Sequence, residues 1–263
     1  MYKKFLKKPL SIKVIITILT AIVFLVTLMI YFYSTQYKDE FESGKIVIDT
    51  KIIKATTSAV KTSTVTPTPS QINESNSPYP LHRAVVATMF WVGEKASGAN
   101  DYIPNESSAW DKDWLDHFGG IDNPYSRSGY YPSDFKPKEN PFYFALPFND
   151  FDEVGKKTDL TFLPWYSDSN TSALKNKWIK IIYKGKVCYG QWEDVGPFEQ
   201  NDFEYVFGNK APKNSRAGID ISPALRTCLE MVSNNKVDWQ FIDEVNVPSG
   251  PWKETVTTSQ LNW

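Results

Sequence analysis

The stretch WIKIIYKGKVCYGQWEDVGPF, residues 178–198, contains two apolar runs separated by a short turn, Lys184-Gly185-Lys186. Runs of β-branched and aromatic residues on either side of a glycine-containing turn predict a β-hairpin. The second run ends in Trp192-Glu193-Asp194, directly before the rigid Gly196-Pro197 turn. Asp194 is therefore a surface charge, a cap for the turn backbone or a catalytic acid.

Further apolar runs predict three more strands, at residues 83–94, 141–148 and 237–245. One helix is predicted over 223–232, where Ser222 is placed to cap the start and Pro223 fits the first turn. Its buried face is marked by apolar residues at helical spacing: Leu225, Cys228, Leu229 and Val232. Several strands and a single short helix predict a mainly β domain, a small barrel.

Segment 107–141 lies between the first two of these strands and is rich in Tyr, Pro and Asp. Its spacing places Trp110 and Trp114 on one face of a helix that Gly119-Gly120 ends. Long ordered loops are usually functional. Aromatic planes pack well on the C–H faces of sugar rings, so the candidate glycan contacts of this segment are Trp110, Trp114, Tyr130 and Tyr131.

The N-terminal third of the chain has a different composition. Residues 1–13 form a basic tail with five lysines, and residues 14–33 carry no charge. A helix of 20 residues spans about 30 Å, the thickness of the hydrocarbon core of a bilayer. The alternatives are a buried core helix and a cleaved signal peptide, but the run ends in Tyr31-Phe32-Tyr33 rather than in small residues. The sequence predicts an uncleaved transmembrane anchor with the lysines in the cytoplasm.

Residues 34–80 are rich in Ser, Thr and Pro and predict a flexible linker, which leaves residues 81–263 as the extracellular domain of a single-pass membrane protein. The chain has 29 basic and 30 acidic residues, so residues 14–263 contain 24 basic and 30 acidic residues, a net charge of −6. Nucleic-acid binding needs clustered Lys and Arg. The composition therefore argues against a nucleic-acid partner.

Both cysteines, Cys188 and Cys228, lie in the predicted extracellular domain. An even count outside the membrane favours a disulfide between them. The alternative is a pair of reduced, buried thiols. The acidic run at 111–117 lacks the glycine turn and the spacing of a calcium loop, so no metal and no cofactor are predicted.

Three motifs together resemble a known family. WEDVGPF (192–198) is similar to the Asp-Arg-Gly-Pro-Phe motif of the rare lipoprotein A family, and AGIDISPAL (217–225) is similar to its second signature, which expansins share. ALPF (145–148) matches the Leu-Pro-Phe-Gly stretch of that family, in the same order along the chain. The resemblance implies a six-stranded double-psi β-barrel, with Asp194 and Asp220 at the ends of pseudo-symmetric strands.

The catalytic pattern of that family is incomplete in this chain. Its lytic transglycosylases pair the Asp of the Gly-Pro motif with a His three residues before the Leu-Pro pair. Asp194 matches the Asp, but Tyr143 stands in place of the His, Val195 replaces the Arg and Asn149 the Gly. A tyrosine is a poor general base at neutral pH because its ordinary pKa is about 10. Tyr143 is instead expected close to Asp194, as a hydrogen-bonding and stacking partner.

Three functions follow from these observations. The favoured one is binding of a polysaccharide, either peptidoglycan or a plant glycan, with Tyr143, Trp192 and Asp220 contacting the ligand. The alternative is glycan cleavage of the lytic transglycosylase type, in which apolar surroundings raise the pKa of Asp194 so that it acts as the acid. A weaker alternative is a barrel that binds proteins, as protease inhibitors do. Asp220 could also serve only the backbone before the helix.

Overall fold

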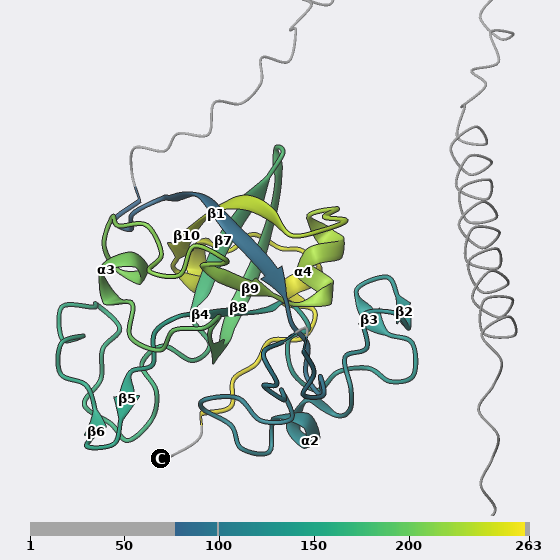
Figure 1. The fold of residues 1–263 in the computed structure, drawn as a ribbon, viewed down its shortest axis with the longest axis horizontal. Coiled ribbons are helices and arrows are strands. Elements are labelled where there is room, and N and C mark those ends of the chain that lie inside the picture. The colour runs from purple at the N-terminus through teal and green to yellow at the C-terminus, as the bar shows by residue number, and fades with distance from the viewer. Residues whose placement is uncertain (1–76, 99, 261–263) are drawn as a thin grey trace, which may run out of the picture. The chain divides into compact units, whose positions relative to one another are not determined.

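The computed structural model describes residues 77–98 and 100–260, which fold mainly into β structure around a closed barrel (Figure 1). The predicted anchor at 14–33 and the linker as far as residue 76 lie outside the described residues. Within the described ranges, no helix has both the length and the apolar character needed to cross a membrane.

Six strands form the barrel in the spatial order β1-β10-β7-β8-β4-β9, and β9 then closes on β1. The predicted hairpin is confirmed as β7 and β8. The other runs supply β4 within its expected range, and β1 and β10, which begin one and two residues earlier than expected and also end earlier. Strand β9 lies in the AGIDISPAL motif. The strands are β1 (His82–Met89), β4 (Tyr143–Leu146), β7 (Trp178–Tyr183), β8 (Lys186–Val195), β9 (Ile219–Ile221) and β10 (Asn235–Ile242).

The strand pairing has an internal symmetry. Two pairs are parallel, β1 with β9 and β4 with β8, and the other four pairs are antiparallel. Exchanging β1 with β8, β4 with β9 and β7 with β10 leaves every pair and its direction unchanged. The first three strands and the last three therefore form two equivalent, interlocked halves. Under this exchange β8 corresponds to β1 rather than to β9, so the expectation that Asp194 and Asp220 end equivalent strands is wrong.

The barrel interior is filled with aromatic and aliphatic side chains. Trp192 packs there against Phe144 and against Phe241, with ring centroids 6.0 Å and 5.9 Å away. A second cluster outside the barrel contains Tyr143 and Trp114, covered by the segment between β1 and β4. Burying a large apolar side chain stabilises a fold by about 1.5–3 kcal/mol, so these clusters hold the barrel and the long segment together.

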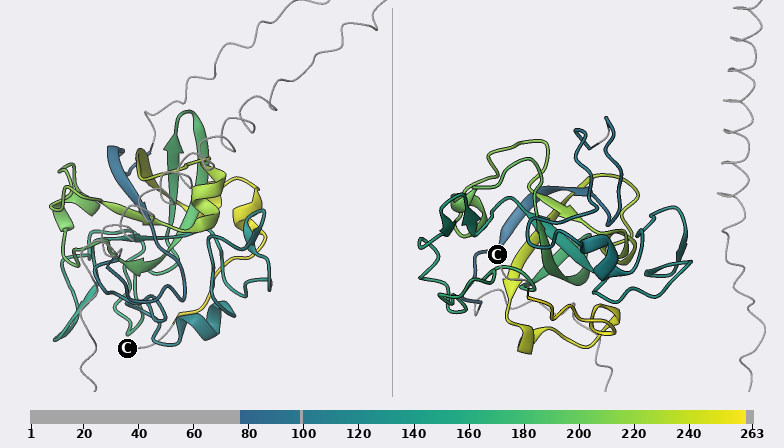
Figure 2. Two further views of the ribbon diagram at one scale, coloured as in Figure 1. Left: turned by 45° about the vertical axis from the view of Figure 1, so that its right-hand side comes forward. Right: turned by 90° about the horizontal axis from the view of Figure 1, so that it is seen from below.

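The long segment carries α2 (Trp114–Phe118), β2 (Arg127–Ser128) and β3 (Tyr131–Pro132), and Figure 2 shows it beside one end of the barrel. The predicted helix is shorter than expected, because α2 begins at Trp114 and excludes Trp110. Gly119 ends the helix, as predicted, with a positive φ of 104°. The smaller elements are β5 (Phe151–Asp152), β6 (Gly155–Lys156), α3 (Phe203–Val206) and two 3₁₀ turns, η2 (Glu244–Asn246) and η3 (Pro251–Lys253).

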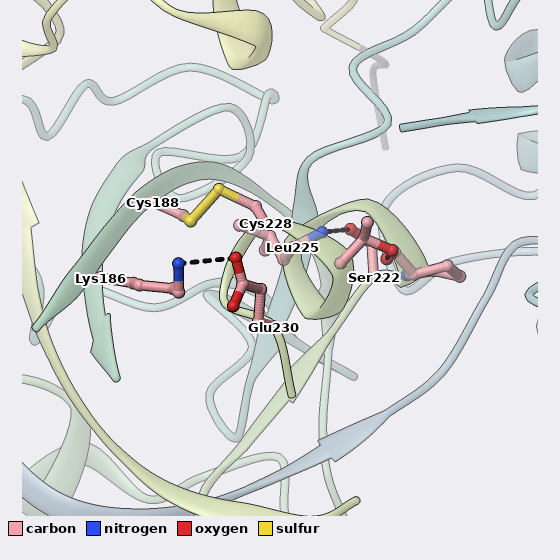
Figure 3. Close-up of a disulfide and its surroundings, with 8 residues drawn as sticks. Lys186, Cys188, Ser222, Leu225, Cys228 and Glu230 are labelled. Carbon is pink, nitrogen blue, oxygen red and sulfur yellow. Dashed lines mark hydrogen bonds and ion pairs between the residues drawn. A yellow bond between two sulfur atoms is a disulfide. The ribbon is translucent and has the colours of Figure 1, made fainter. Parts of the chain in front are cut away.

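Helix α4 (Pro223–Cys228) is held against β8 by a disulfide (Figure 3). The predicted cap is confirmed, because the Ser222 hydroxyl accepts a hydrogen bond from the Leu225 N–H at 3.2 Å. The predicted Cys188–Cys228 bridge is also confirmed, with Cα atoms 6.3 Å apart. Val232 does not belong to the buried stripe: the helix ends at Cys228, and Val232 is 88% exposed.

The disulfide closes a loop between residues separated by 40 positions. In the chain-entropy model such a bridge stabilises the fold by about 4 kcal/mol. We expect the Cys188→Ala/Cys228→Ala variant to lose about that much unfolding free energy in urea, and its stability to be insensitive to dithiothreitol. A loss below about 1 kcal/mol would show that the bridge does not stabilise the domain.

Candidate functional site

One row of side chains crosses four neighbouring strands at one end of the barrel. Thr88 of β1 lies opposite Asp220 of β9, Asp220 lies opposite Ala145 of β4, and Ala145 lies opposite Asp194 of β8. The register shifts between Phe144 and Ala145, because β8 carries one extra residue there. Such bulges re-aim side chains. The two aspartates of the motifs are thus two strands apart in one row.

Asp194 is 8% exposed and is held by two backbone groups. Its Oδ1 accepts hydrogen bonds from the N–H groups of Ala109 (2.7 Å) and Val195 (2.8 Å). Burial raises the pKa of Asp194 to about 7, against these two hydrogen bonds and with a smaller contribution from Asp220. Oδ2 accepts no hydrogen bond from the described residues. One oxygen of Asp194 therefore accepts backbone hydrogen bonds from the long segment and from β8 itself, and the other has no donor among the described residues. With a pKa of about 7, the carboxyl is half-protonated at neutral pH.

Asp220 is partly buried, and its Oδ1 accepts a hydrogen bond from the Thr88 hydroxyl. Burial raises the pKa of Asp220 to about 6, although the Thr88 bond acts in the opposite direction. Its other oxygen, Oδ2, lies 3.9 Å from the position that a Cβ at Gly196 would occupy. Gly196 has a φ of +152°, which a residue with a side chain rarely adopts. The glycine turn and Asp220 are thus neighbours at the same end of the barrel.

A third acid, Glu94, joins the site without having been predicted. It follows β1 in the loop that leads into the long segment and is 7% exposed. Its Oε2 accepts a hydrogen bond from the Asn105 amide at 3.0 Å. Burial raises the pKa of Glu94 to about 7, and Asp220 adds to the increase, while hydrogen bonds from Asn105 and Asn100 oppose it. The signal in the sequence was an acid placed directly after an apolar strand and a glycine.

These three acids line one pocket of about 270 Å³, which we call the acid pocket. Its other lining groups include Phe198, Arg226 and the amide side chains of Asn100, Asn105 and Asn234. Phe198 is 40% exposed, and the Arg216 guanidinium lies 3.8 Å from the centre of its ring. Arg216 also pairs with Asp101 at 3.0 Å. The pocket therefore combines acids, amides and one exposed aromatic ring.

Tyr143 does not belong to this pocket, and the expectation that it shares a hydrogen bond with Asp194 is wrong. It is fully buried, and its hydroxyl donates to Asp122 Oδ2 (2.9 Å) and accepts from the Val92 N–H (3.0 Å). Asp122 in turn accepts a hydrogen bond from Arg127. The long segment thus satisfies the tyrosine hydroxyl inside the second apolar cluster, which a ligand does not reach.

The predicted aromatic contacts also lie away from the pocket lining. Trp110, Trp114 and Trp192 are at most 4% exposed, so none offers a face to a sugar. Trp192 helps to fix the backbone of Asp194, because its Nε1–H donates a hydrogen bond to the Asp194 carbonyl at 2.7 Å. Tyr130 packs on Phe142, and the Tyr131 hydroxyl donates to Glu254. Among the aromatic residues beside Asp194, Phe198 is the exposed one.

A larger cavity of about 560 Å³ lies at the beginning of β1 and beside Gly218, which precedes β9. His82 contributes to it but stacks on Trp239 with ring centroids 3.9 Å apart, and burial lowers the His82 pKa to about 4. A neutral, stacked histidine with no carboxyl among the cavity's lining residues offers little acid–base chemistry. The acid pocket is the better candidate.

No group of three or more His, Cys, Asp or Glu within 77–98 and 100–260 is arranged to hold a metal ion. Comparison with protein-family models and with curated proteins finds no match to this chain. The residues of the acid pocket are thus the basis for assigning its chemistry: hydrogen bonding to hydroxyl-rich ligands, and proton transfer near neutral pH.

The raised pKa of Asp194 makes folding stability depend on pH. A carboxyl whose folded pKa exceeds its unfolded pKa of about 3.9 contributes full stability below that value and loses it as pH rises through the folded pKa of about 7. We expect Asp194→Asn to remove up to about 4 kcal/mol of the stability lost between pH 4 and pH 8. Urea unfolding across this range measures the difference.

The matched control is Glu153→Gln, which replaces an exposed acid in the turn between β5 and β6. Its stability should follow the wild-type pH curve. If the Asp194→Asn curve also runs parallel to the wild-type curve, Asp194 does not bind its proton more tightly in the folded state.

Proposed function

We propose that this protein is a membrane-anchored, extracellular double-psi barrel that binds a polysaccharide at the acid pocket. The exchange symmetry of the strand pairing supports the double-psi interpretation, because the fold that the motifs imply has two pseudo-symmetric halves. The position of the motifs supports it too, since the Asp-x-Gly-Pro stretch ends β8 and the second signature contains β9 and the start of α4. The apolar run at 14–33 provides the anchor.

The observation that carries the proposal is Asp194, a buried acid with one unbonded oxygen in a pocket shared with two other acids. A half-protonated carboxyl both donates and accepts hydrogen bonds, as a sugar hydroxyl does. Asn105 and Asn234 also line the pocket and carry amide donors and acceptors. Phe198 supplies an aromatic face at the edge. Polar groups converging beside one aromatic ring suit a carbohydrate.

Glycan cleavage is the second candidate, and the pKa of Asp194 favours it. A general acid works best when its pKa lies near the working pH, and Asp194 has a pKa of about 7. Glu94 and Asp220 supply further carboxyls in the same pocket, so a proton donor and a proton acceptor are both present. The Tyr143 that replaces the family's histidine is not required for this chemistry.

Co-sedimentation of the purified full-length protein with peptidoglycan and with cellulose tests binding. We expect Phe198→Ala and Asp220→Ala to weaken sedimentation about tenfold or more, because each removes a ligand-facing group. Tyr125→Ala is the matched control, since Tyr125 is 86% exposed and does not line the pocket. Sedimentation with neither polymer, or equal loss in the control, would contradict the proposal.

The same incubation separates binding from cleavage. Release of reducing ends or anhydro-sugars that Asp194→Asn reduces at least about a hundredfold would establish the second candidate, with Asp194 as its acid. Retention on the polymer without release would establish binding alone.

A further inference from the structure

We propose that Arg216 is a positioning residue of the acid pocket, which orients the ring of Phe198 at the pocket mouth and ties it to the loop that carries Asp101. The inference rests on the proposed function, in which Phe198 contacts the ligand, and adds the residue that holds this contact in place. Arg216 does not itself line the pocket, and it lies in the loop that precedes β9.

The side chain of Arg216 joins two segments that are far apart in the sequence. Its guanidinium carbon lies 3.8 Å from the centre of the Phe198 ring, which follows the end of β8. Its Nη2 donates a hydrogen bond to Asp101 Oδ2 at 3.0 Å, in the loop between β1 and α2. Phe198 lines the pocket, and so do Asn100 and Ile103 close to Asp101. One side chain therefore connects two parts of the pocket lining.

Arg216 has a fixed base from which to make these contacts. Its backbone N–H donates a hydrogen bond to Asn214 Oδ1 at 3.0 Å. The next residue, Ala217, is 2% exposed, and the N–H of Gly218 donates to the Val86 carbonyl of β1 at 3.0 Å. The loop is thus attached to the barrel directly after Arg216, so the guanidinium is presented to Phe198 from a fixed point.

The two residues that Arg216 contacts have an uncommon backbone conformation. Phe198 has a φ of 62° and Asp101 a φ of 52°, both in the left-handed region that favours glycine. Residues with a side chain stay in this region only where surrounding contacts hold them. The stacking on Phe198 and the ion pair with Asp101 are such contacts, and one residue supplies both.

These contacts lie at the surface, so their effect is local. The side chains of Arg216 and Asp101 are 60% and 50% exposed, and ion pairs this exposed add little to folding stability. Phe198 is 40% exposed, so without a neighbour its ring would be free to change orientation. A ring that is already held loses less freedom when a ligand binds, which raises the affinity. Arg216 therefore acts on binding more than on folding.

The chemistry of the two contacts requires arginine rather than any cation. A guanidinium is planar, so it can stack on an aromatic face and at the same time donate hydrogen bonds in its own plane. A lysine ammonium is a compact charge without such a plane. Arg216→Lys therefore keeps the positive charge near Asp101 but loses the stacking that orients Phe198.

NMR of the full-length protein measures the contact between Arg216 and Phe198 without any ligand. Protons that lie over the face of an aromatic ring resonate upfield of their usual position. We expect the Arg216 side-chain protons to be shifted upfield in the wild type and to return to the ordinary arginine position in Phe198→Leu. The control is Lys186→Ala, which removes another exposed ion pair, with Glu230, and should leave the shift unchanged. Ordinary shifts in the wild type would overturn the inference.

Co-sedimentation with peptidoglycan and cellulose measures the effect on binding. We expect Arg216→Ala to weaken sedimentation about fivefold, Arg216→Lys to weaken it nearly as much, and Lys186→Ala to leave it unchanged. Because Arg216 acts through Phe198, adding Arg216→Ala to Phe198→Ala should cause no further loss. Urea unfolding of Arg216→Ala should give the wild-type midpoint.

The outcomes separate this inference from the proposed function. If Phe198→Ala weakens sedimentation and Arg216→Ala does not, the inference is wrong and the glycan site stands. Additive losses in the double variant, or full activity of Arg216→Lys, would also overturn the inference, because Arg216 would then act independently of the ring or through charge alone. If the wild type sediments with neither polymer, the proposed function is contradicted and the inference falls with it.

Discussion

The register of four neighbouring strands is the constraint on which the site depends. Parallel pairing of β1 with β9 and of β4 with β8, together with antiparallel pairing of β4 with β9, brings Thr88, Asp220, Ala145 and Asp194 into one row. A shift of one residue in any strand would turn its side chain to the opposite face of the sheet. The bulge in β8 opposite Phe144 and Ala145 fixes this arrangement, because it sets Asp194 rather than Glu193 opposite Ala145. Two motifs far apart in the chain thereby contribute to one pocket.

Glu193 and Asp194 are consecutive acids of β8 that have different surroundings and different roles. Glu193 is 1% exposed, yet Lys175 pairs with it, and Lys175 also donates to Ser259 of the C-terminal segment. That buried pair ties the C-terminal segment to the barrel, and breaking such a pair costs about 3–5 kcal/mol. Asp194 has no cation and keeps one oxygen for the pocket. The first acid stabilises the fold through its ion pair, whereas the second lines the acid pocket.

Much of the barrel follows from local sequence signals. The hairpin of β7 and β8 follows from apolar runs on either side of a short turn, and the Ser222 cap follows from the residue types at the start of a helix. The pairing of Cys188 with Cys228 follows from the count of two cysteines in the chain. Asp194 was found through the glycine turn beside it, and Asp220 through the resemblance of its motif to a family signature. These features need no knowledge of how distant segments meet.

The remainder depends on contacts between distant segments. Composition does not distinguish a core tryptophan from a surface one, so Trp110 and Trp114 were taken as glycan contacts although both are buried. Tyr143 was predicted beside Asp194 because it stands where the family has a histidine. Its hydroxyl instead donates a hydrogen bond to Asp122, 21 residues earlier in the chain. Glu94 carries no motif and reaches the pocket only because Asn105 folds its loop back.

The central claim is that Glu94, Asp194 and Asp220 form one protonatable cluster in a pocket. Titration of the side-chain carboxyl carbons by NMR, assigned with Glu94→Gln, Asp194→Asn and Asp220→Asn, tests it most directly. We expect three coupled signals with apparent pKa values near 6 to 7, each lowered when a neighbouring acid is replaced. Three independent titrations at the ordinary carboxyl values of about 4 would contradict the account.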